Sequence, residues 1–531
     1  MIYKSISITL NILLTVYEYS KRGYRRIMKL NIVFGGKAGQ GPNILAEVVS
    51  EGLIKSGYYV FYSRDYQSLI RGGHNFNALT FSESPVYSNQ SKIDVLVCLD
   101  DKTEEIHKNS LNKKAVIMKG DEHNMFFAGS IFKLLGLDLR LIESSLRKLR
   151  NYDENIKEAK QGYYAEKRTI NVAKSKNQLG QTLFMNGNQG ISKGAIASGL
   201  DYYYAYPMTP ATPVMMELAQ LSVQKDAKHK VIELENEIAV MIAALGSSIA
   251  GTRAMVGTSG GGFDLMTEGL SMAGQAEIPI VIYLSSRPGP STGLATYTAQ
   301  DSLNLALYSG HGEFSRVVIA PGDALESLEA TNQAFYLSQK FRVPAFVLGD
   351  KHLAESKQII EGGEKIIEIQ NSITQPERFN SYEHDEKGIA TESAEITKNN
   401  FDRKGKKHKE LAKETGKFVQ YKIHGNKKSK NLILGWGSTK GAIIDALNEG
   451  KIDAKFLQVI YMKPFPAKQV SDEIKKSKKV VLVENNVTGQ LGDLITRKTG
   501  FFIEDKNKIL RYDGRPFFSD ELAEEIKRRI K

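Results

Sequence analysis

Residues 206–300 constrain the fold of this chain most, because short polar clusters alternate there with apolar segments. The apolar run 238–249 predicts a helix, residues 253–258 a strand, and residues 278–284 a buried strand that ends near Arg287. Between the two strands, residues 259–262 predict a glycine loop that leads into another helix. This alternation is typical of a parallel sheet flanked by helices, where ligands bind outside the carboxyl ends of the strands. We therefore predict an α/β fold.

Three residues of this stretch are candidate site residues. Pro207 and Pro210 restrict the backbone around Thr209 and place its hydroxyl on a rigid turn. Arg287 follows a predicted strand, whereas Glu237 opens an apolar helix. That acid is either exposed in the first turn, where it favours the helix dipole, or buried and paired. One use of a buried acid is a hydrogen bond to the pyrimidine nitrogen of thiamine diphosphate, which helps to form the nucleophilic ylid. Spacing alone favours the exposed acid.

Four segments in this order and spacing resemble the α subunit of 2-oxoacid:ferredoxin oxidoreductases. They are Tyr-Pro-Met-Thr-Pro at 206–210, Glu-Asn-Glu-Ile-Ala at 235–239, Thr-Ser-Gly-Gly-Gly at 258–262 and Arg-Pro-Gly-Pro-Ser-Thr-Gly at 287–293. The resemblance implies a thiamine diphosphate pyrimidine-binding domain, which we place at residues 181–356.

The same resemblance implies a role for each candidate residue. Glu237 activates the aminopyrimidine, Thr209 contacts the substrate carboxylate or keto group, and Arg287 binds the 2-oxoacid carboxylate. A guanidinium on a rigid loop suits this last role, because it binds a carboxylate through two parallel hydrogen bonds. Met208, residues 211–212 and Gly261 depart from the commoner family pattern, which affects the expected substrate range more than the chemistry.

The amino-terminal part begins with an apolar strand that runs into the glycine turn 35–41, and a helix follows. Glycines at such a turn let backbone amides approach a phosphate. Residues 28–180 resemble the Rossmann-like γ domain of the same family, here fused ahead of the α part. That domain is associated with coenzyme A, so Lys37 and Arg71 are candidate phosphate contacts. The alternative for both is a role in stabilising the turn or an interface.

The remaining segments complete the expected domain organisation. Residues 431–531 resemble the transketolase C-terminal-like domain II, to which we assign no catalysis. Residues 357–430 lose periodicity and predict a basic linker, with twelve Lys and Arg against three acids between Lys398 and Lys430. A docking surface for an acidic partner is the alternative. We interpret residues 1–27 as a disordered or non-native upstream extension, with Met28 as the true start; a membrane-surface anchor is the alternative.

Two absences in the sequence predict a second subunit. The chain has one cysteine, Cys98, in an apolar run, so it has neither a disulfide framework nor the ligands of an iron–sulfur cluster. It also lacks the Gly-Asp-Gly motif of thiamine enzymes: Gly322-Asp323 continues with Ala324, and Gly349-Asp350 continues with Lys351. We therefore assign no metal ligands here. The resemblance implies a β subunit that carries Mg²⁺ with the diphosphate site and a 4Fe–4S cluster.

The implied reaction is the coenzyme A-dependent oxidative decarboxylation of pyruvate, 2-oxoglutarate or a range of 2-oxoacids, with electrons passing to ferredoxin. We expect a cytoplasmic heterodimer that is active only with its β subunit and has no stable membrane insertion. Nucleic-acid binding is not expected, because the lysine-rich segment lacks aromatic residues at stacking spacing. The alternatives are a thiamine-dependent E1-type dehydrogenase component and a non-catalytic assembly or binding subunit that shares the fold.

Overall fold

The computed structural model describes residues 29–67, 73–120, 123–172, 174–179, 182–369 and 380–531. The proposed upstream extension 1–27 and the candidate Arg71 lie outside these residues. The described chain divides into two compact units. The first holds the residues up to Val60, Thr80–Pro85 and the stretch from Ile93 to Leu179, and the second holds the remainder. Within the described residues, no helix is both long enough and apolar enough to cross a membrane.

The first unit is built on parallel strands. They are β1 (Lys29–Lys37), β4 (Ile93–Cys98) and β5 (Leu111–Lys119). Strand β1 pairs with β4, and β4 with β5. The helices of this unit are α2 (Pro42–Lys55), α3 (Asp101–His107), α4 (Asn124–Leu134), α5 (Arg140–Leu146) and α6 (Tyr152–Ala165). Cys98 is buried, and burial raises the pKa of its thiol to about 11, as expected of a core residue.

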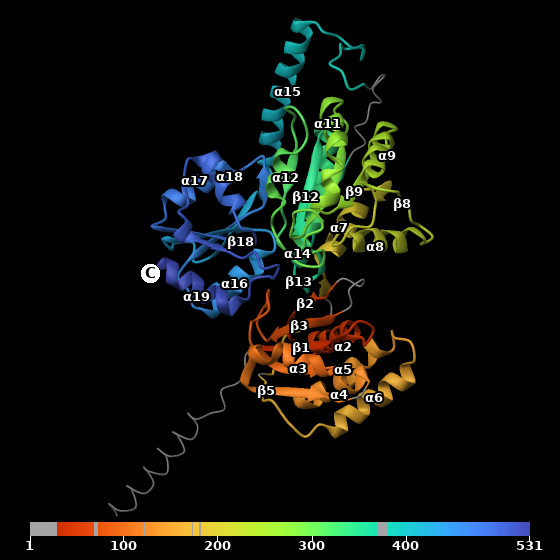
Figure 1. The fold of residues 1–531 in the computed structure, drawn as a ribbon, viewed down its shortest axis with the longest axis vertical. Helices are drawn as coiled ribbons and strands as arrows, with labels where there is room; N and C mark the ends of the chain where they lie inside the picture. The colour runs from red at the N-terminus through yellow and green to blue at the C-terminus, as the bar shows by residue number, and fades with distance from the viewer. Residues whose placement is uncertain (1–28, 68–72, 121–122, 173, 180–181, 370–379) are drawn as a thin grey trace, which may run out of the picture. The chain divides into compact units, whose positions relative to one another are not determined.

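The second unit contains a seven-stranded sheet in the order β17-β11-β12-β10-β9-β7-β8. Its strands are β7 (Tyr202–Ala205), β8 (Lys230–Glu233), β9 (Ala254–Thr258), β10 (Ile280–Ser286), β11 (Val317–Ile319), β12 (Pro344–Asp350) and β17 (Tyr461–Lys463). All the pairs are parallel except β11 with β17. The predicted strand 278–284 is thus confirmed within two residues at each end. Figure 1 shows this sheet in the upper part of the ribbon.

The side chains of the central strand β10 alternate between two apolar cores. Ile280, Ile282 and Leu284 pack with α9 (Glu237–Ile249), α10 (Gly260–Asp264), α11 (Thr267–Gln275) and α12 (Leu303–Tyr308). Val281 and Tyr283 pack with α7 (Gly187–Ala197), α8 (Thr212–Ser222) and α13 (Ala324–Phe341). Helices therefore cover both faces, as the sequence pattern predicted.

The carboxyl-terminal sheet of the second unit has the order β14-β16-β15-β18-β19. Its strands are β14 (Tyr421–Gly425), β15 (Asn431–Trp436), β16 (Lys455–Val459), β18 (Lys479–Glu484) and β19 (Lys508–Leu510). Helices α17 (Ala467–Lys475) and α18 (Gln490–Thr499) cover one face, and α16 (Thr439–Glu449) and α19 (Ser519–Ile530) cover the other (Figure 1).

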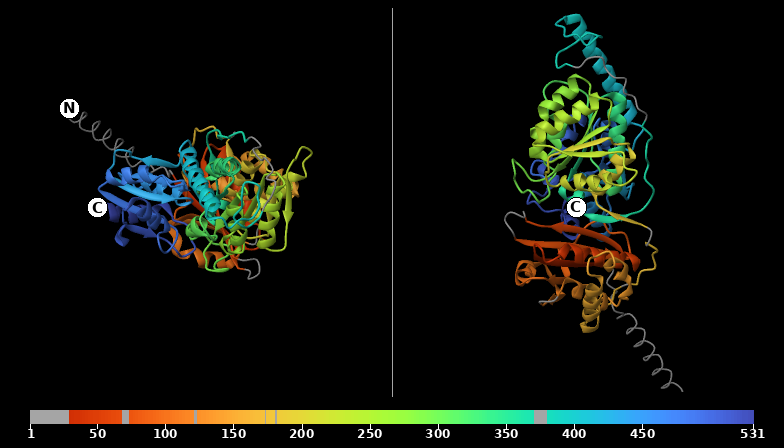
Figure 2. Two further views of the ribbon diagram at one scale, coloured as in Figure 1. Left: turned by 90° about the horizontal axis from the view of Figure 1, so that it is seen from above. Right: turned by 90° about the vertical axis from the view of Figure 1, so that its right-hand side faces the viewer.

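The segment expected to be a linker contains regular structure. Strand β13 (Lys357–Ile360) pairs antiparallel with β6 (Leu183–Met185) and with β2 (Tyr59–Asp65). The 22-residue helix α15 (Ala394–Thr415) extends away from the central sheet (Figures 1 and 2). The loss of periodicity at residues 357–430 predicted only a basic linker and did not reveal this strand and helix. The helix escaped prediction because only Leu411, Glu414 and Thr415 are buried, so it has no apolar stripe to reveal its period.

Candidate functional site

Glu237 is buried at the first turn of α9. The chain leaves β8 and turns at Asn236, whose φ of 85° is unusual for a residue other than glycine. The Asn236 side chain caps the helix by accepting a hydrogen bond from Ala239 N at 3.1 Å. Glu237 is only 3% exposed, and its Oε1 atom has no hydrogen-bond partner among the described residues. The exposed-acid interpretation is thus wrong: the carboxyl group is buried, although its Oε1 atom is unpaired among these residues.

The glycine loop after β9 provides space for this carboxylate. A Cβ atom on Gly262 would lie 2.4 Å from Glu237 Oε1 and 2.2 Å from Thr258 Oγ1. Both distances are far below van der Waals contact, so this position requires glycine. Thr258 Oγ1 and Ser259 Oγ are also buried without a hydrogen-bond partner in the part of the chain that the structure describes. Sequence reasoning treated these residues only as a loop, although polar side chains at a strand end were a signal.

Arg287 lies at the end of β10 and connects the other candidates. Its Nη1 atom donates a hydrogen bond to Thr209 O at 2.9 Å, while its Nε atom is buried and has no partner among the described residues. Burial lowers the pKa of Arg287, and the charge of Glu237 partly offsets this effect. The structure therefore brings Thr209, Glu237 and Arg287 together beyond the carboxyl ends of β7, β8 and β10, and their roles stay predictions.

Asp301 holds the loop that follows Arg287. Its Oδ1 atom accepts a hydrogen bond from Ser286 Oγ, and its Oδ2 atom accepts one from Gly289 N, both at 2.8 Å. Sequence reasoning missed Asp301, because it acts from beyond the far end of the 287–293 segment and no spacing rule connects the two. Its effect is to fix the backbone on both sides of Arg287.

The donor set fits the pyrimidine part of thiamine diphosphate but not its metal part. A buried carboxyl oxygen without a partner suits a ring nitrogen, because it accepts a hydrogen bond when ionised and donates one when protonated. In contrast, the described residues contain no group of three or more His, Cys, Asp or Glu side chains that could hold a metal ion. Both Gly-Asp pairs serve as helix caps instead: Asp323 accepts from Glu326 N, and Asp350 from Leu353 N.

Lys37 is exposed at the end of β1 in the first unit. Its glycine turn is organised by Gln40, whose Oε1 atom accepts from Lys37 N at 2.7 Å and whose Nε2 atom donates to Leu99 O at 2.7 Å. Gln40 was not singled out from the sequence. The phosphate role of Lys37 remains a prediction, and so does that of Arg71.

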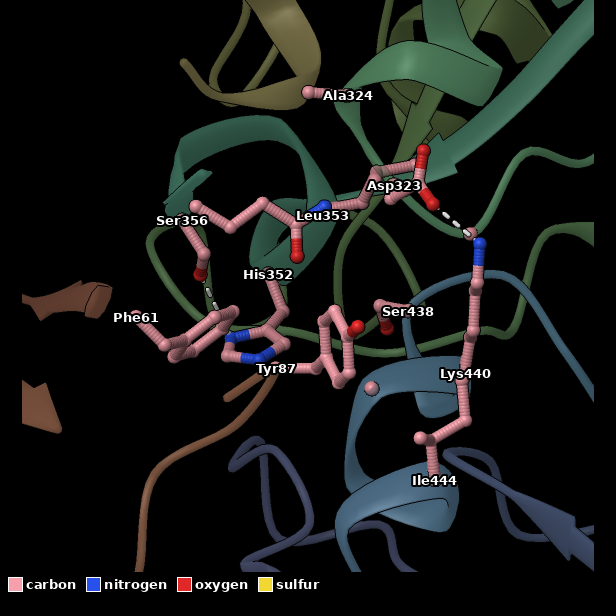
Figure 3. Close-up of a pocket in the computed structure, with 13 residues that line it drawn as sticks. Phe61, Tyr87, Asp323, Ala324, His352, Leu353, Ser356, Ser438, Lys440 and Ile444 are labelled. Atoms are coloured by element: carbon pink, nitrogen blue, oxygen red, sulfur yellow. Dashed lines mark hydrogen bonds and ion pairs between the residues drawn. The ribbon is translucent and has the colours of Figure 1, made fainter. Parts of the chain in front are cut away.

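A different cavity of the second unit is shown in Figure 3. Its lining includes Phe61, Tyr87, His352 and Lys440. Lys440 Nζ is paired with Asp323 and with Glu326 at 2.6 Å, and His352 Nδ1 lies 3.2 Å from Ser356 Oγ. Burial lowers the pKa of His352 to about 3, so its ring is neutral. None of Thr209, Glu237 and Arg287 lines this cavity.

Three family models match the chain in consecutive blocks. Residues 193–420 match "Pyruvate flavodoxin/ferredoxin oxidoreductase, thiamine diP-bdg", residues 31–123 match "Pyruvate ferredoxin/flavodoxin oxidoreductase", and residues 431–522 match "Pyruvate:ferredoxin oxidoreductase core domain II". Together with the buried Glu237, these matches define the class as a thiamine diphosphate-binding oxidoreductase of 2-oxoacids.

Curated relatives match nearly the whole chain. The 2-oxoacid:ferredoxin oxidoreductase subunit alpha of Saccharolobus solfataricus is 30% identical, over 94% of this chain and 98% of its own length. The 2-oxoacid:ferredoxin oxidoreductase subunit alpha of Sulfolobus sp is 29% identical, over 95% of this chain and 97% of its own length. The solved 2-oxoglutarate:ferredoxin oxidoreductase from Magnetococcus marinus has the same fold, with a TM-score of 0.84 and 23% identity over 95% of this chain and all of that one.

The chain therefore belongs to the family of 2-oxoacid:ferredoxin oxidoreductase α subunits. As an α subunit it works with partner subunits, and ferredoxin is the electron acceptor. The family, the fold class and the enzyme class predicted from the sequence are confirmed.

Proposed function

We propose that this chain supplies the pyrimidine side of the thiamine diphosphate site and the anchor for the substrate carboxylate. The reaction is the coenzyme A-dependent oxidative decarboxylation of a 2-oxoacid to an acyl-CoA and CO₂. The observation that carries the proposal is the buried Glu237 carboxylate with its unpartnered Oε1 atom. When bound, thiamine diphosphate supplies the carbon nucleophile and the electron sink for decarboxylation.

Glu237 has the environment of a group that holds a proton for a ring nitrogen. A buried acceptor without a partner costs about 1–3 kcal/mol, and a ligand nitrogen removes that cost. The carboxylate also lies in the first turn of α9, where the helix dipole favours negative charge. Glu237 Oε1 is therefore the atom that we assign to proton exchange with the aminopyrimidine ring.

Arg287 and Thr209 are the proposed substrate contacts. Because Nη1 is used by Thr209 O, the edge formed by Nε and Nη2 is the one that can bind a carboxylate through two parallel bonds. Burial strengthens this interaction, since little water competes for the guanidinium. Thr209 is half-buried on the turn whose backbone Arg287 contacts, so its hydroxyl is assigned to the keto or carboxylate oxygen of the substrate.

The proposed partner is a β subunit that carries Mg²⁺, the diphosphate site and a 4Fe–4S cluster. A single buried cysteine cannot ligate such a cluster, and the sequence has no Gly-Asp-Gly. Coenzyme A is the proposed acyl acceptor, with Lys37 and Arg71 as its candidate phosphate contacts. Support for coenzyme A comes from the Magnetococcus marinus relative, which is described with 2-oxoglutarate, coenzyme A and succinyl-CoA bound.

The substitution Glu237→Gln tests this function. We expect the complex with the β subunit, purified anaerobically, to lose roughly 10²- to 10⁴-fold in coenzyme A-dependent dye reduction, because the amide cannot exchange the proton. The assay uses pyruvate, 2-oxobutyrate and 2-oxoglutarate. Glu235→Gln is the matched control, since Glu235 belongs to the same segment but is exposed. Near-normal turnover of the Glu237 variant would remove this residue from the mechanism, and a wild-type complex silent with every 2-oxoacid would contradict the reaction.

A further inference from the structure

Two arginines are buried among the described residues, Arg287 and Arg316, which are 9% and 3% exposed. In both, the Nε atom is buried and has no hydrogen-bond partner among these residues. Arg287 lies at the proposed binding site for the substrate carboxylate. Arg316 directly precedes β11, and the proposed function gives it no role. Because burying a charged group without a partner is costly, Arg316 indicates a second site for an anion.

Part of the Arg316 side chain has an ordinary structural role. Its Nη1 and Nη2 atoms donate to Ala306 O at 3.2 Å and to Ser309 O at 2.6 Å, at the carboxyl end of α12. Lys463 of β17 contacts the same helix end, since its Nζ atom donates to Leu307 O at 3.3 Å. Such contacts satisfy free carbonyls and favour the helix dipole, which amounts to about half a negative charge. The helix end therefore uses only some of the donors of these two side chains.

Further cations gather around Arg316 and Lys463. Arg497 and Lys498 lie in the last turn of α18, which packs against α12 (Figure 1). Burial, Arg316 and these two cations of α18 lower the pKa of Lys463 to about 8. Partial burial and the charges of Lys463 and Lys498 also lower the pKa of His408 on α15. Several elements of the second unit therefore bring positive charge to one place.

We call these five residues the cationic cluster: Arg316, His408, Lys463, Arg497 and Lys498. None of them forms an ion pair with a carboxylate in the part of the chain that the structure describes, and burial alone lowers the pKa of Arg316 to about 10. In contrast, each buried lysine among the described residues has a carboxylate partner: Lys351 pairs with Glu355, Lys440 with Glu326 and Lys455 with Glu473. The fold thus leaves the charge of the cationic cluster uncompensated.

The burial of the cluster favours a small phosphate anion over a protein surface. Arg497 and Lys498 are exposed, so a flat surface could contact them, but it could not reach the guanidinium of Arg316. A phosphate group offers several oxygen atoms to Arg316 Nε and to Lys463 at once. It also carries up to about two negative charges, which suits several cations better than the single charge of a carboxylate.

We propose that the cationic cluster is a further phosphate-binding site, formed by none of the residues assigned to thiamine diphosphate or coenzyme A. The phosphate contacts Arg316 Nε, Lys463 and the side chains of α18, and so connects α12, α18 and β17. It stabilises the second unit, because it binds only the folded form. Free phosphate and a phosphate ester share this chemistry, and the experiment below distinguishes them. This inference goes beyond the proposed function.

Thermal unfolding of the separate full-length chain tests the site, because this chain lacks the proposed diphosphate site of the β subunit. Inorganic phosphate and AMP are the probes, and sodium chloride at equal ionic strength is the reference. We expect phosphate to raise the thermal midpoint of the wild type, and the concentration dependence gives the dissociation constant. For Lys463→Met and Lys498→Met this constant should rise at least about tenfold, since each variant loses a charge-assisted contact. Lys468→Met, at an exposed position of α17, is the control and should respond as wild type does.

Chemical labelling locates the bound anion without any substitution. Acetic anhydride modifies free lysine amines, and mass spectrometry measures the rate at each residue. We expect phosphate to slow the modification of Lys463 and Lys498 and to leave that of Lys468 unchanged. If Lys463 only capped α12, Lys463→Met would lower the thermal midpoint equally with and without phosphate, and phosphate would not slow the labelling.

An equal phosphate response of the wild type and all three variants would overturn the proposal, and so would a wild-type chain that responds to neither probe. A response to AMP alone, lost in Lys463→Met, would assign the site to a phosphate ester. A higher KM for ferredoxin in the Lys498→Met complex, with no response of the chain to either probe, would assign the cluster to an acidic protein surface and overturn the phosphate site.

Discussion

At the scale of single residues, Arg287 is expected to contribute to the binding of the 2-oxoacid but not to the binding of coenzyme A. Its free Nε edge faces no protein acceptor among the described residues, so its removal deletes a charge-assisted contact to the 2-oxoacid carboxylate. We expect Arg287→Ala to raise KM for the 2-oxoacid by roughly 10- to 100-fold and to leave KM for coenzyme A unchanged. Steady-state kinetics with each reactant varied in turn measure both values. Equal increases for the two reactants would contradict the assignment.

Gly262 provides a second test at this scale, with its neighbour as the control. A Cβ at Gly262 collides with Thr258 Oγ1 and Glu237 Oε1, whereas a Cβ at Gly261 first meets Ser291 O at 3.4 Å. We expect Gly262→Ala to destabilise the chain by about 1–3 kcal/mol and to abolish tight binding of thiamine diphosphate by the complex. Gly261→Ala is expected to be tolerated. Urea unfolding and calorimetric titration measure the two effects, and equal behaviour of the two variants would refute the role of Gly262.

At the scale of elements, the helices and strands that could be predicted from the sequence are those with a clear pattern of apolar residues. Strand β10 and helix α9 carry continuous apolar runs, so both could be located from the sequence, and Glu237 and Arg287 could be placed at their ends. Helix α15 could not, because its stability comes from charge pairs with distant residues such as Glu277. The sequence likewise did not decide whether Glu237 is buried, since its burial depends on the space left by Gly262.

The attachment of α15 has a defined pH dependence. Burial raises the pKa of Glu277, but Arg403 and Lys407 outweigh it and lower the pKa to about 2, from an ordinary value of 4.5. The ion pairs therefore add stability that is complete above about pH 4.5 and disappears as the pH falls towards 2, by up to about 3 kcal/mol. We expect wild type and Glu277→Gln to differ in urea midpoint at pH 6 and to converge as the pH falls. Asp402→Asn, in an exposed pair on the same helix, should show no difference at pH 6.

At the scale of the whole molecule, the carboxyl-terminal sheet supports the loop that follows Arg287. Gln300, at the end of that loop, is fully buried and donates from Nε2 to Trp436 O at 2.8 Å. Its Oε1 atom accepts from Asn485 N at 2.9 Å, and Asn486 Nδ2 donates to its backbone oxygen at 2.9 Å. These bonds join segments more than a hundred residues apart, so no local pattern in the sequence predicted them. They give a domain without assigned catalysis a direct connection to the substrate anchor.

This connection predicts a combined loss of stability and substrate affinity for Gln300→Leu. The leucine leaves Asn485 N buried without its partner, which costs about 1–3 kcal/mol in the free energy of unfolding. Trp436 O keeps the hydrogen bond that it accepts from Thr439 Oγ1. Because the loop then loses the two side-chain bonds of Gln300 and keeps only its backbone bonds to Asn485 and Asn486, KM for the 2-oxoacid should rise while KM for coenzyme A stays constant. Urea unfolding and steady-state kinetics measure the two effects, with Gln224→Leu at an exposed position as the control. A destabilised variant with an unchanged KM for the 2-oxoacid would mean that the carboxyl-terminal sheet stabilises the fold without positioning Arg287.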